Sequence, residues 1–390
     1  MSCKVCTRCG KCGLWSSAPI AEAGVAVLPA LVRREGLGAA VDIGSTTIVA
    51  RVYDLATGEL LRQESTFNPQ RRIAADVMGR ISAAMDGRLD ELRDDVRAAV
   101  RDCIGEHKVS EAVVVGNTTM LHLFAGICPA SYATAPFQAD RLFGERMTID
   151  GVDVRLPRCS HGFFGADAVA AVRMSGMSER GGRELLADIG TNGEIALWSD
   201  SRLTIASVAA GPAFERPGVT GSEIIAAIAD GLDGGAIDET GRVEGELRSG
   251  IAQADVRAVQ LAKAAVFAGL NSLLAKTGTP LKSVTRFSLA GGFGSGLDPA
   301  KAARIGLFAA ELLPVVKVCG NLAIEGATAA LFDPSFGDVT DRLAAEAHHI
   351  ELGGDKDFSS AFVEMMMFLP KERRQDRRQG CFRRPVAAEA

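Results

Sequence analysis

The sequence predicts an α/β fold built from two similar lobes with a cleft between them. The first observation is an approximate internal repeat, in which a strand, an Asp-x-Gly turn, a second strand and then helices occur at 39–52 and again after Arg183. The second is composition, since 43 glycines and 5% aromatic residues suit a chain with many tight turns. The third is size, because 390 residues with 47% hydrophobic content can build two to three packed domains.

The first half of the chain is expected to form two strands followed by helices. Residues 39–52 predict a strand, a turn and a second strand, and 54–58 predict the next turn. Apolar spacing predicts helices over 71–85 and 88–104. A short buried strand at 112–115 then leads through a turn into a helix that begins at Met120.

The second half repeats this order. Strands are expected at 184–187 and 194–198, a long alanine-rich helix at 255–275, and a further strand at 286–290. Residues 321–331 are small and apolar, which suits a helix that packs closely between the lobes and returns to the first one. Residues 362–369, with their three methionines, are expected to form a late core strand. His122 is expected to be a core histidine in an apolar helix.

These elements divide the chain into five segments. They are a cysteine-rich segment (1–14), a linker (15–37), a first lobe (38–182), a second lobe (183–370) and a basic tail expected to be disordered (371–390). The tail carries seven Lys or Arg against three Asp or Glu. Such a charge run is more often a solvated segment than a binding site for an acidic partner.

Three glycine turns, each after an apolar run, carry the candidate site. They read Asp-Ile-Gly-Ser-Thr-Thr at 42–47, Asp-Ile-Gly-Thr-Asn-Gly at 188–193 and Leu-Ala-Gly-Gly-Phe-Gly at 289–294. Glycine permits the hairpin, so that amides and hydroxyls can face phosphate oxygens, while a Gly-Gly turn lets adenosine lie on the backbone. The aspartates cannot contact phosphate but can hold Mg²⁺ through water or orient an attacking water. One such turn would be an ordinary capped hairpin, whereas three in order favour a nucleotide site.

Two further segments leave alternatives open. The turn at 116–119 follows a strand and opens a helix, so it can contact phosphate or simply cap the helix. Residues 211–215, which end in Glu215, lie either at the edge of the cleft or in a surface turn. The candidate catalytic residues are Asp42 and Asp188, and the candidate cofactor-binding residues are Gly44, Ser45, Thr46, Thr47, Gly116, Asn117, Thr118, Gly190, Thr191, Asn192, Gly193, Gly211, Gly291, Gly292, Phe293 and Gly294.

Four of the nine cysteines fall in the first dozen residues. They are candidate metal ligands: Cys3, Cys6, Cys9 and Cys12. The C-x2-C-x2-C spacing lets three thiolates reach one iron–sulfur cluster, but the fourth cysteine follows after two residues instead of three, and no proline closes the run. Four thiolates also suit tetrahedral zinc. A four-iron four-sulfur cluster is the favoured interpretation, with zinc or no metal as alternatives.

The order of short motifs resembles the actin, sugar-kinase and heat-shock-chaperone ATPase superfamily. More narrowly, it resembles the C-terminal ATPase domain of reductive activators of corrinoid proteins, over about residues 38–370. The matching stretches lie at 42–47, 68–70, 75–81, 116–120, 165–168, 188–194, 210–215 and 290–294. The resemblance implies two ribonuclease-H-like lobes of the actin and sugar-kinase type, with ATP and Mg²⁺ in the cleft between them.

The resemblance also implies an activity and partners. Such a protein uses ATP to drive an electron onto cob(II)alamin, which restores cob(I)alamin on a corrinoid methyl-carrier protein bound transiently near the cleft. An electron donor is then needed, and association into a homodimer is left open. Long members of the family carry a plant-like two-iron ferredoxin domain, followed by linker and middle domains, for which this chain is expected to lack room.

Composition limits the other classes of function. A net charge of −5 argues against nonspecific nucleic-acid binding. No apolar run is expected to approach the roughly 18 to 20 residues that cross a membrane, and cysteines stand where a signal peptide would be apolar, so a cytoplasmic protein is expected. Two alternatives remain: a small-molecule kinase of the same superfamily, which would leave the cysteines unexplained, and an ATP-switched protein that remodels its partner without electron transfer.

Overall fold

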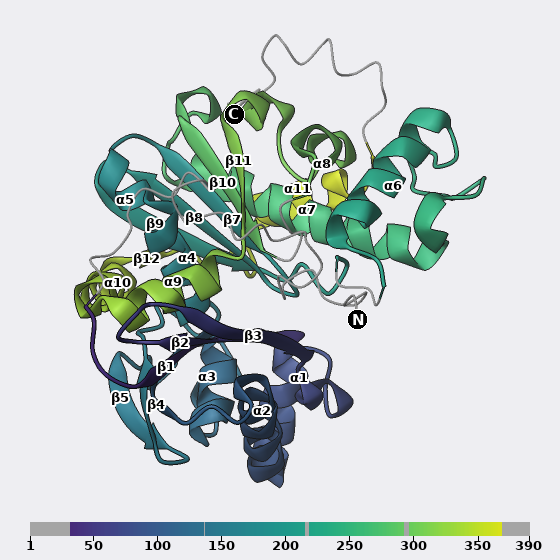
Figure 1. Cartoon of the computed structure of the whole chain (residues 1–390). Coiled ribbons are helices and arrows are strands. Elements are labelled where there is room, and N and C mark those ends of the chain that lie inside the picture. Colours follow the sequence, from purple (N-terminus) through teal and green to yellow (C-terminus); the bar gives the residue numbers. More distant parts are fainter. Residues whose placement is uncertain (1–31, 136, 215–217, 292–295, 369–390) are drawn as a thin grey trace.

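The computed structural model describes residues 32–135, 137–214, 218–291 and 296–368. These residues form two lobes, each built on a six-stranded mixed sheet, as Figure 1 shows with the first lobe below and the second above. We name residues 37–180 the first lobe and residues 183–368 the second. The predicted α/β class and the internal repeat are therefore confirmed.

The sheet of the first lobe combines a meander with parallel strands. Its strands are β1 Leu37–Ile43, β2 Thr47–Asp54, β3 Leu60–Phe67, β4 Val109–Gly116, β5 Glu145–Ile149 and β6 Val152–Leu156. The spatial order is β3-β2-β1-β4-β6-β5. Strands β1, β2 and β3 pair antiparallel, while β4 pairs parallel with β1 and with β6.

The sheet of the second lobe has the same plan. Its strands are β7 Glu184–Ile189, β8 Gly193–Ser199, β9 Arg202–Val208, β10 Arg286–Gly291, β11 Val316–Gly320 and β12 His348–His349. Strands β7, β8 and β9 form the meander, and β10 runs parallel to β7 and β11. Because β1 and β7 occupy equivalent places, the two Asp-x-Gly turns end equivalent strands.

Helices cover both sheets, and α9 lies between the lobes. The helices are α1 Val77–Ala83, α2 Leu89–Ile104, α3 Thr118–Ala125, α4 Ala166–Ser175, α5 Met177–Arg180, α6 Gly221–Gly234, α7 Gln253–Lys276, α8 Pro299–Ile305, α9 Leu322–Phe332, α10 Pro334–Glu346 and α11 Lys356–Met365. Although α9 follows the last long strand of the second lobe, it packs against α4, β1 and β4 of the first (Figure 1). Its glycine and alanines allow this approach, since a Cβ on Gly326 would lie 2.7 Å from that of Ala170.

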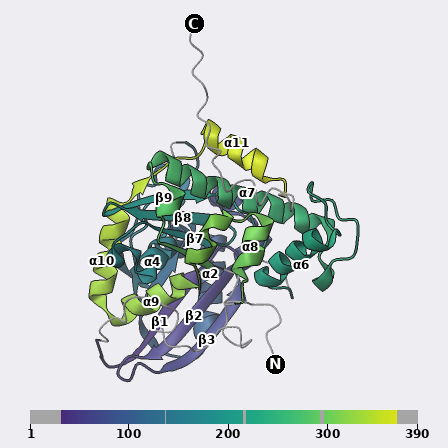
Figure 2. The same ribbon diagram turned by 90° about the horizontal axis from the view of Figure 1, so that it is seen from above.

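Helix α7 differs from what composition led us to expect. Among the described residues it alone is long and apolar enough to cross a membrane, with a mean hydropathy of 1.4 over its most apolar window. However, 78% of that window is buried inside the protein, because α7 lies across β8 and β9 and is covered by α11 (Figure 2). This is the environment of a core helix.

Two predicted elements differ from the structure. The helix expected over 71–85 is found only in part, as α1, which is preceded by a 3-10 turn at Pro69–Arg72 and the N-cap Asp76 and gives way to a kinked segment at Ala84–Arg88. The kink arises because Gly87 takes a positive φ of 88°.

The late strand expected over 362–369 is contradicted by α11, which ends at Met365. Asp355 caps α11, and Phe358, Phe362 and Met365 follow helical spacing along the face that meets α7. Met365 is buried but Met367 is 44% exposed, so the three methionines do not form a core strand.

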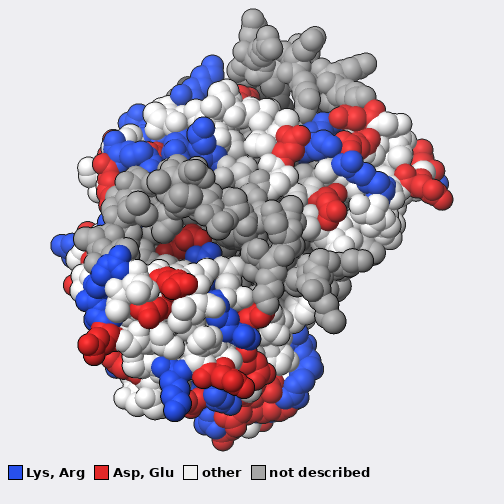
Figure 3. All heavy atoms as spheres, viewed as in Figure 1, with Lys and Arg blue, Asp and Glu red and all other residues white. Residues whose placement is uncertain are grey.

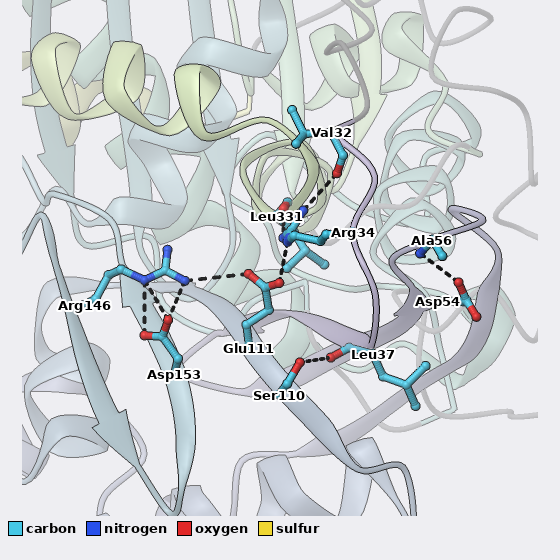
Figure 4. Close-up of polar contacts among 10 residues, drawn as sticks. All are labelled: Val32, Arg34, Leu37, Asp54, Ala56, Ser110, Glu111, Arg146, Asp153 and Leu331. Atoms are coloured by element: carbon cyan, nitrogen blue, oxygen red, sulfur yellow. Dashed lines mark hydrogen bonds and ion pairs between the residues drawn. The ribbon is translucent and has the colours of Figure 1, made fainter.

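The first described residues are anchored to the first lobe and to α9. The Val32 amide donates to Phe332 O at 2.9 Å. Arg34 donates to Leu331 O at 2.6 Å (Figure 4). Arg34 also pairs with Glu111 of β4. The chain therefore enters the folded body beside the C-terminal end of α9.

Charged side chains on the face shown in Figure 3 alternate in sign, most densely over the lower part of the first lobe. Ion pairs at the surface of the first lobe include Arg72 with Glu91 and Asp95, and Arg93 with Asp90. On this face no extended patch of one sign appears among the described residues.

Candidate functional site

A polar cleft lies where the two lobes meet. Its open space is about 480 Å³, and this volume includes space that is open to solvent. The carboxyl ends of β1, β4 and β7 reach it, as expected for a site at the ends of parallel strands. The lining residues are Asp42, Gly44, Ser45, Thr46, Asn117, Asp167, Asp188, Gly190, Thr191, Asn192, Glu194, Asn321 and Ala323.

The two Asp-x-Gly hairpins touch each other across this cleft. The Thr46 hydroxyl lies 2.8 Å from the Thr191 hydroxyl, and both side chains are buried. Each hairpin is closed by its own backbone, with the Gly44 amide donating to Thr47 O and the Gly190 amide to Asn192 O. The hydroxyl-bearing turns of the repeat therefore form one surface shared by both lobes.

Four carboxyl groups line the cleft, and none of its described lining residues is a lysine or arginine. Asp42 accepts a hydrogen bond of 2.9 Å from Asn321 Nδ2, and Asp167 accepts one of 2.8 Å from the Ala168 amide. Burial, together with the nearby charges of Asp42 and Asp188, raises the pKa of Asp167 to about 8. This excess negative charge would be relieved by a divalent cation.

Asn321 was not predicted as a site residue. It is buried at the start of α9, where its Oδ1 accepts from the amides of Ala323 and Ile324 while its Nδ2 holds Asp42. One side chain thus caps the helix that connects the lobes and fixes the aspartate of the first turn.

The turn at 116–119 acts as a helix cap. The Asn117 side chain accepts from the Thr119 amide at 3.0 Å, and Asn117 still lines the cleft. Thr118 is fully buried and donates to His161 O at 2.6 Å. Its hydroxyl is therefore directed at the protein and not at the cleft. His122 is buried, as expected, with its Nδ1 2.8 Å from Thr118 O.

Three glycines near the cleft are needed for contacts between backbones. A Cβ on Gly116 would lie 2.7 Å from Ile43 O, and a Cβ on Gly165 would lie 2.4 Å from Gly116 O. Gly291 has a φ of 112°, and its Cβ would lie 2.2 Å from Ile189 O. These glycines bring β1, β4, β7 and β10 close enough for their ends to share one cleft.

The structure thus divides the predicted site residues into three groups. Those that line the cleft are Asp42, Gly44, Ser45, Thr46, Asn117, Asp188, Gly190, Thr191 and Asn192. Those that lie outside its lining are Thr47, Gly116, Thr118, Gly193, Gly211 and Gly291. Those that lie outside the described residues are Gly292, Phe293, Gly294 and the cysteines Cys3, Cys6, Cys9 and Cys12, and the same holds for Glu215.

Asp167, Glu194, Asn321 and Ala323 are the additional lining residues. Two sequence signals could have found some of them, since Asp167 lies in the motif at 165–168 and Glu194 directly follows the second turn. In the part of the chain that the structure describes, no group of three His, Cys, Asp or Glu side chains is arranged to hold a metal ion by itself. A metal in the cleft would therefore need ligands from a nucleotide or from water.

Comparison with known protein families assigns both lobes. Residues 37–180 match the RACo middle region, and residues 183–217 and 248–378 match the C-terminal ASKHA domain of RACo. The chain belongs to the RACo family. The expectation that it has no room for a middle domain is wrong, because the first lobe is that domain.

Individual relatives agree with this assignment. The corrinoid activation enzyme RamQ of Eubacterium limosum is 29% identical over an alignment that covers 85% of this chain and 70% of RamQ. A methylated-amine-specific corrinoid protein reductase of Methanosarcina barkeri is 22% identical over 84% of this chain and 76% of its own length. The solved structure of a reductive activator for a corrinoid iron–sulfur protein superposes with a TM-score of 0.81 at 26% identity, covering 86% of this chain and 67% of that one.

Proposed function

We propose that this protein is an ATP-dependent reductive activator of a corrinoid methyl-carrier protein. In the proposed reaction one electron from a donor converts Co(II) of the bound corrinoid to Co(I), and ATP with water gives ADP and phosphate. The observation that carries the proposal is the cleft itself. Carboxyl and hydroxyl groups from equivalent turns of both lobes converge there in a chain of the RACo family.

The cleft residues fit a nucleotide that arrives with Mg²⁺. A triphosphate would meet the carboxyl groups of Asp42, Asp167 and Asp188, and no described lysine or arginine in the lining offsets the negative charge of those that are ionised. When Mg²⁺ is bound, it supplies positive charge that offsets the carboxylates and the phosphates, and it usually keeps several water ligands. We assign Asp42 and Asp188 to the waters around the metal and to the attacking water, and Ser45, Thr46 and Thr191 to hydrogen bonds with phosphate.

Contacts between the lobes offer a route from ATP to the partner. Thr46 and Thr191 touch across the cleft, and Asn321 links Asp42 to the helix that joins the lobes. A phosphate group seated between the two hairpins would replace the hydroxyl contact, and its loss on hydrolysis would let the hairpins meet again. We propose that this change of lobe contact drives the partner complex through electron transfer.

We propose further that Cys3, Cys6, Cys9 and Cys12 bind an iron–sulfur cluster. This rests on the spacing of the cysteines alone. Anaerobic purification followed by iron, sulfide and zinc analysis tests it. Iron with acid-labile sulfide supports a cluster, whereas zinc or no metal contradicts it and places the electron source on another protein.

The activity is tested with a purified corrinoid methyl-carrier protein prepared in the Co(II) state. The full chain is added with a low-potential chemical reductant, and the cobalt is followed by the loss of its Co(II) paramagnetic resonance signal. We expect conversion to Co(I) only when MgATP is present. Equal conversion without ATP would contradict the proposal.

The same assay separates the alternatives. Hydrolysis of ATP with a changed affinity for the carrier but no gain in Co(I) would indicate partner remodelling without electron transfer. Transfer of the terminal phosphate to a small molecule, with no effect of the corrinoid carrier, would indicate a kinase.

A further inference from the structure

Arg80 is a buried arginine that lies directly behind the first Asp-x-Gly hairpin. It stands on α1 with an exposed fraction of 0%. Its guanidinium donates to Ser45 O at 2.6 Å and to Gln70 Oε1 and Ala74 O at 3.1 Å, and it lies 3.0 Å from Met120 Sδ. None of these partners is charged, and among the described residues no carboxylate pairs with Arg80 within 4 Å.

The charge of Arg80 persists at neutral pH. Burial, and to a smaller extent the charge of Arg71, lowers its pKa to about 10, while Asp76 acts in the opposite direction. The group therefore stays protonated in a low-dielectric environment. Its guanidinium contacts the backbone carbonyl of Ser45, a residue that lines the cleft. A buried charge without an ionic partner costs folding free energy. Its presence here therefore indicates that it stabilises an anion bound in the cleft.

Asn68 completes the support of the hairpin. Its Nδ2 donates to Gly44 O at 3.0 Å, so the carbonyls of Gly44 and Ser45 are both held from the side away from the cleft. In a planar trans peptide the carbonyl of one residue and the amide of the next point in opposite directions. Holding these two carbonyls therefore turns the amides of Ser45 and Thr46 away from Asn68 and Arg80.

We infer that Arg80, with Asn68, is a positioning residue for phosphate binding, which orients the amides of the first hairpin toward the phosphates and supplies the positive charge that the cleft lining lacks. This inference rests on the proposed use of ATP. It predicts a dependence on ligand charge that an arginine with only a structural role would not produce. Its contribution must grow with the charge of the ligand and vanish for an uncharged nucleoside.

The test compares the dissociation constants of MgATP, MgADP and adenosine for the wild-type full chain and for Arg80→Met. We expect the variant to weaken MgATP about tenfold or more, MgADP less, and adenosine not at all. Arg80→Lys, which keeps the charge, should stay within about threefold of wild type for MgATP. Arg173→Met is the matched control, since Arg173 is also a buried arginine of the first lobe but pairs with Glu179 and contacts Phe336.

Equal weakening of all three ligands, or no weakening of MgATP, would overturn the inference. If Arg80→Met does not fold, as judged by its thermal unfolding, Asn68→Ala takes its place. It should weaken MgATP and MgADP severalfold and spare adenosine, and a uniform or absent effect overturns the inference. A wild-type protein that binds none of the three ligands would instead contradict the proposed function.

Discussion

Asp42, Asp167 and Asp188 are held close enough for the charge of one to disturb the ionisation of another. The raised pKa of Asp167 follows from its burial and from the charges of the other two carboxyl groups. A protein gains no stability from this crowding. Carboxyl groups that are held together at a cost in stability most often bind a cation or take part in a reaction.

The second-lobe aspartate should be essential for turnover. Changing Asp188→Asn keeps the size of the side chain but removes the charge that we assign to metal-bound or attacking water. We expect ATP hydrolysis to fall at least a hundredfold, with an unchanged thermal unfolding midpoint. Asp86→Asn, at an exposed site of the first lobe, is the control and should hydrolyse ATP normally. Normal turnover by the Asp188 variant would contradict the site assignment.

The contact between Asn321 and Asp42 gives a second prediction. In Asn321→Asp the capping oxygen for α9 is retained, but the donor to Asp42 is replaced by a carboxylate only about 3 Å away. We expect loss of ATP hydrolysis at pH 7 together with a lower unfolding temperature. Asn321→Ser keeps the cap without adding charge, so it should retain more activity. Equal activity of Asn321→Asp and wild type would show that this contact does not position Asp42.

The position of a residue in the chain decided which site residues could be predicted. Asp42 and Asp188 lie at the ends of apolar strands and Ser45 lies in the turn that follows one, and a turn at the end of a strand is visible in sequence. Asp167 and Asn321 lie at the starts of helices, where an acidic or amide side chain usually means no more than a cap. Gly116 and Gly291 were assigned to the ligand because a close approach to a ligand and to another backbone both require glycine.

At the scale of elements, the repeated strand–turn–strand unit sets the frame of the molecule. The parallel neighbours β1 with β4, and β7 with β10, bring their carboxyl ends together at the cleft. Their approach depends on glycine where a side chain would strike the adjacent backbone. Substitution of those glycines should therefore destabilise the fold, whereas substitution of glycines with open space around them should be tolerated.

Gly291→Ala tests this dependence at the end of β10. The substitution places a Cβ on a residue with a φ of 112° and 2.2 Å from Ile189 O, so we expect a loss of more than about 2 kcal/mol in the free energy of unfolding. Gly234→Ala is the control, because it lies at the end of α6 with nothing within 4 Å, and it should be neutral or gain up to about 1 kcal/mol. Chemical denaturation measures the free energy of unfolding of both variants, and similar values would show that the end of β10 does not depend on glycine at 291.

The strands beside the three turns and the helices α2 and α7 were predictable from their apolar residues, whereas β3, β9, α6 and α10 were not predicted. The failures at 71–85 and 362–369 have local physical causes. Pro69 and Asp76 start two separate helical segments where apolar spacing indicated one. In α11 a run of adjacent apolar residues fits a strand or a helix equally well, and only the packing of Phe358 and Phe362 against α7 and its neighbours decides.

On the scale of the whole molecule, a pair of stacked histidines joins the lobes. His161 of the first lobe lies parallel to His349 of β12 in the second, with ring centroids 3.7 Å apart. Burial lowers the pKa of both rings, to about 4 for His349, where the charge of His161 acts in the same direction. Glu351 opposes these shifts, and His348 acts on His349 in the same direction as His161. The stack is therefore formed by neutral rings.

This stack predicts how stability depends on pH. Both histidines hold fewer protons in the folded protein than in the unfolded chain, so their stabilising contribution is complete above about pH 6.5. It is lost as the pH falls from there toward about 4. We expect the thermal unfolding midpoint to fall over this window, and less steeply in His349→Asn. His348→Asn, at the exposed neighbouring position, removes only the smallest of the influences on the pKa of His349 and should change the dependence less than His349→Asn does. An identical profile for the His349 variant would contradict the role of the stack.

The cleft between the lobes should bind ATP only together with Mg²⁺, because the described residues lining it include four carboxyl groups and no lysine or arginine. Calorimetric titration of ATP into the full chain, once with Mg²⁺ and once with a chelator, measures this directly. We expect one binding site per chain with Mg²⁺ and at least a hundredfold weaker binding without it. No binding in Mg²⁺, or equal affinity in the chelator, would contradict it.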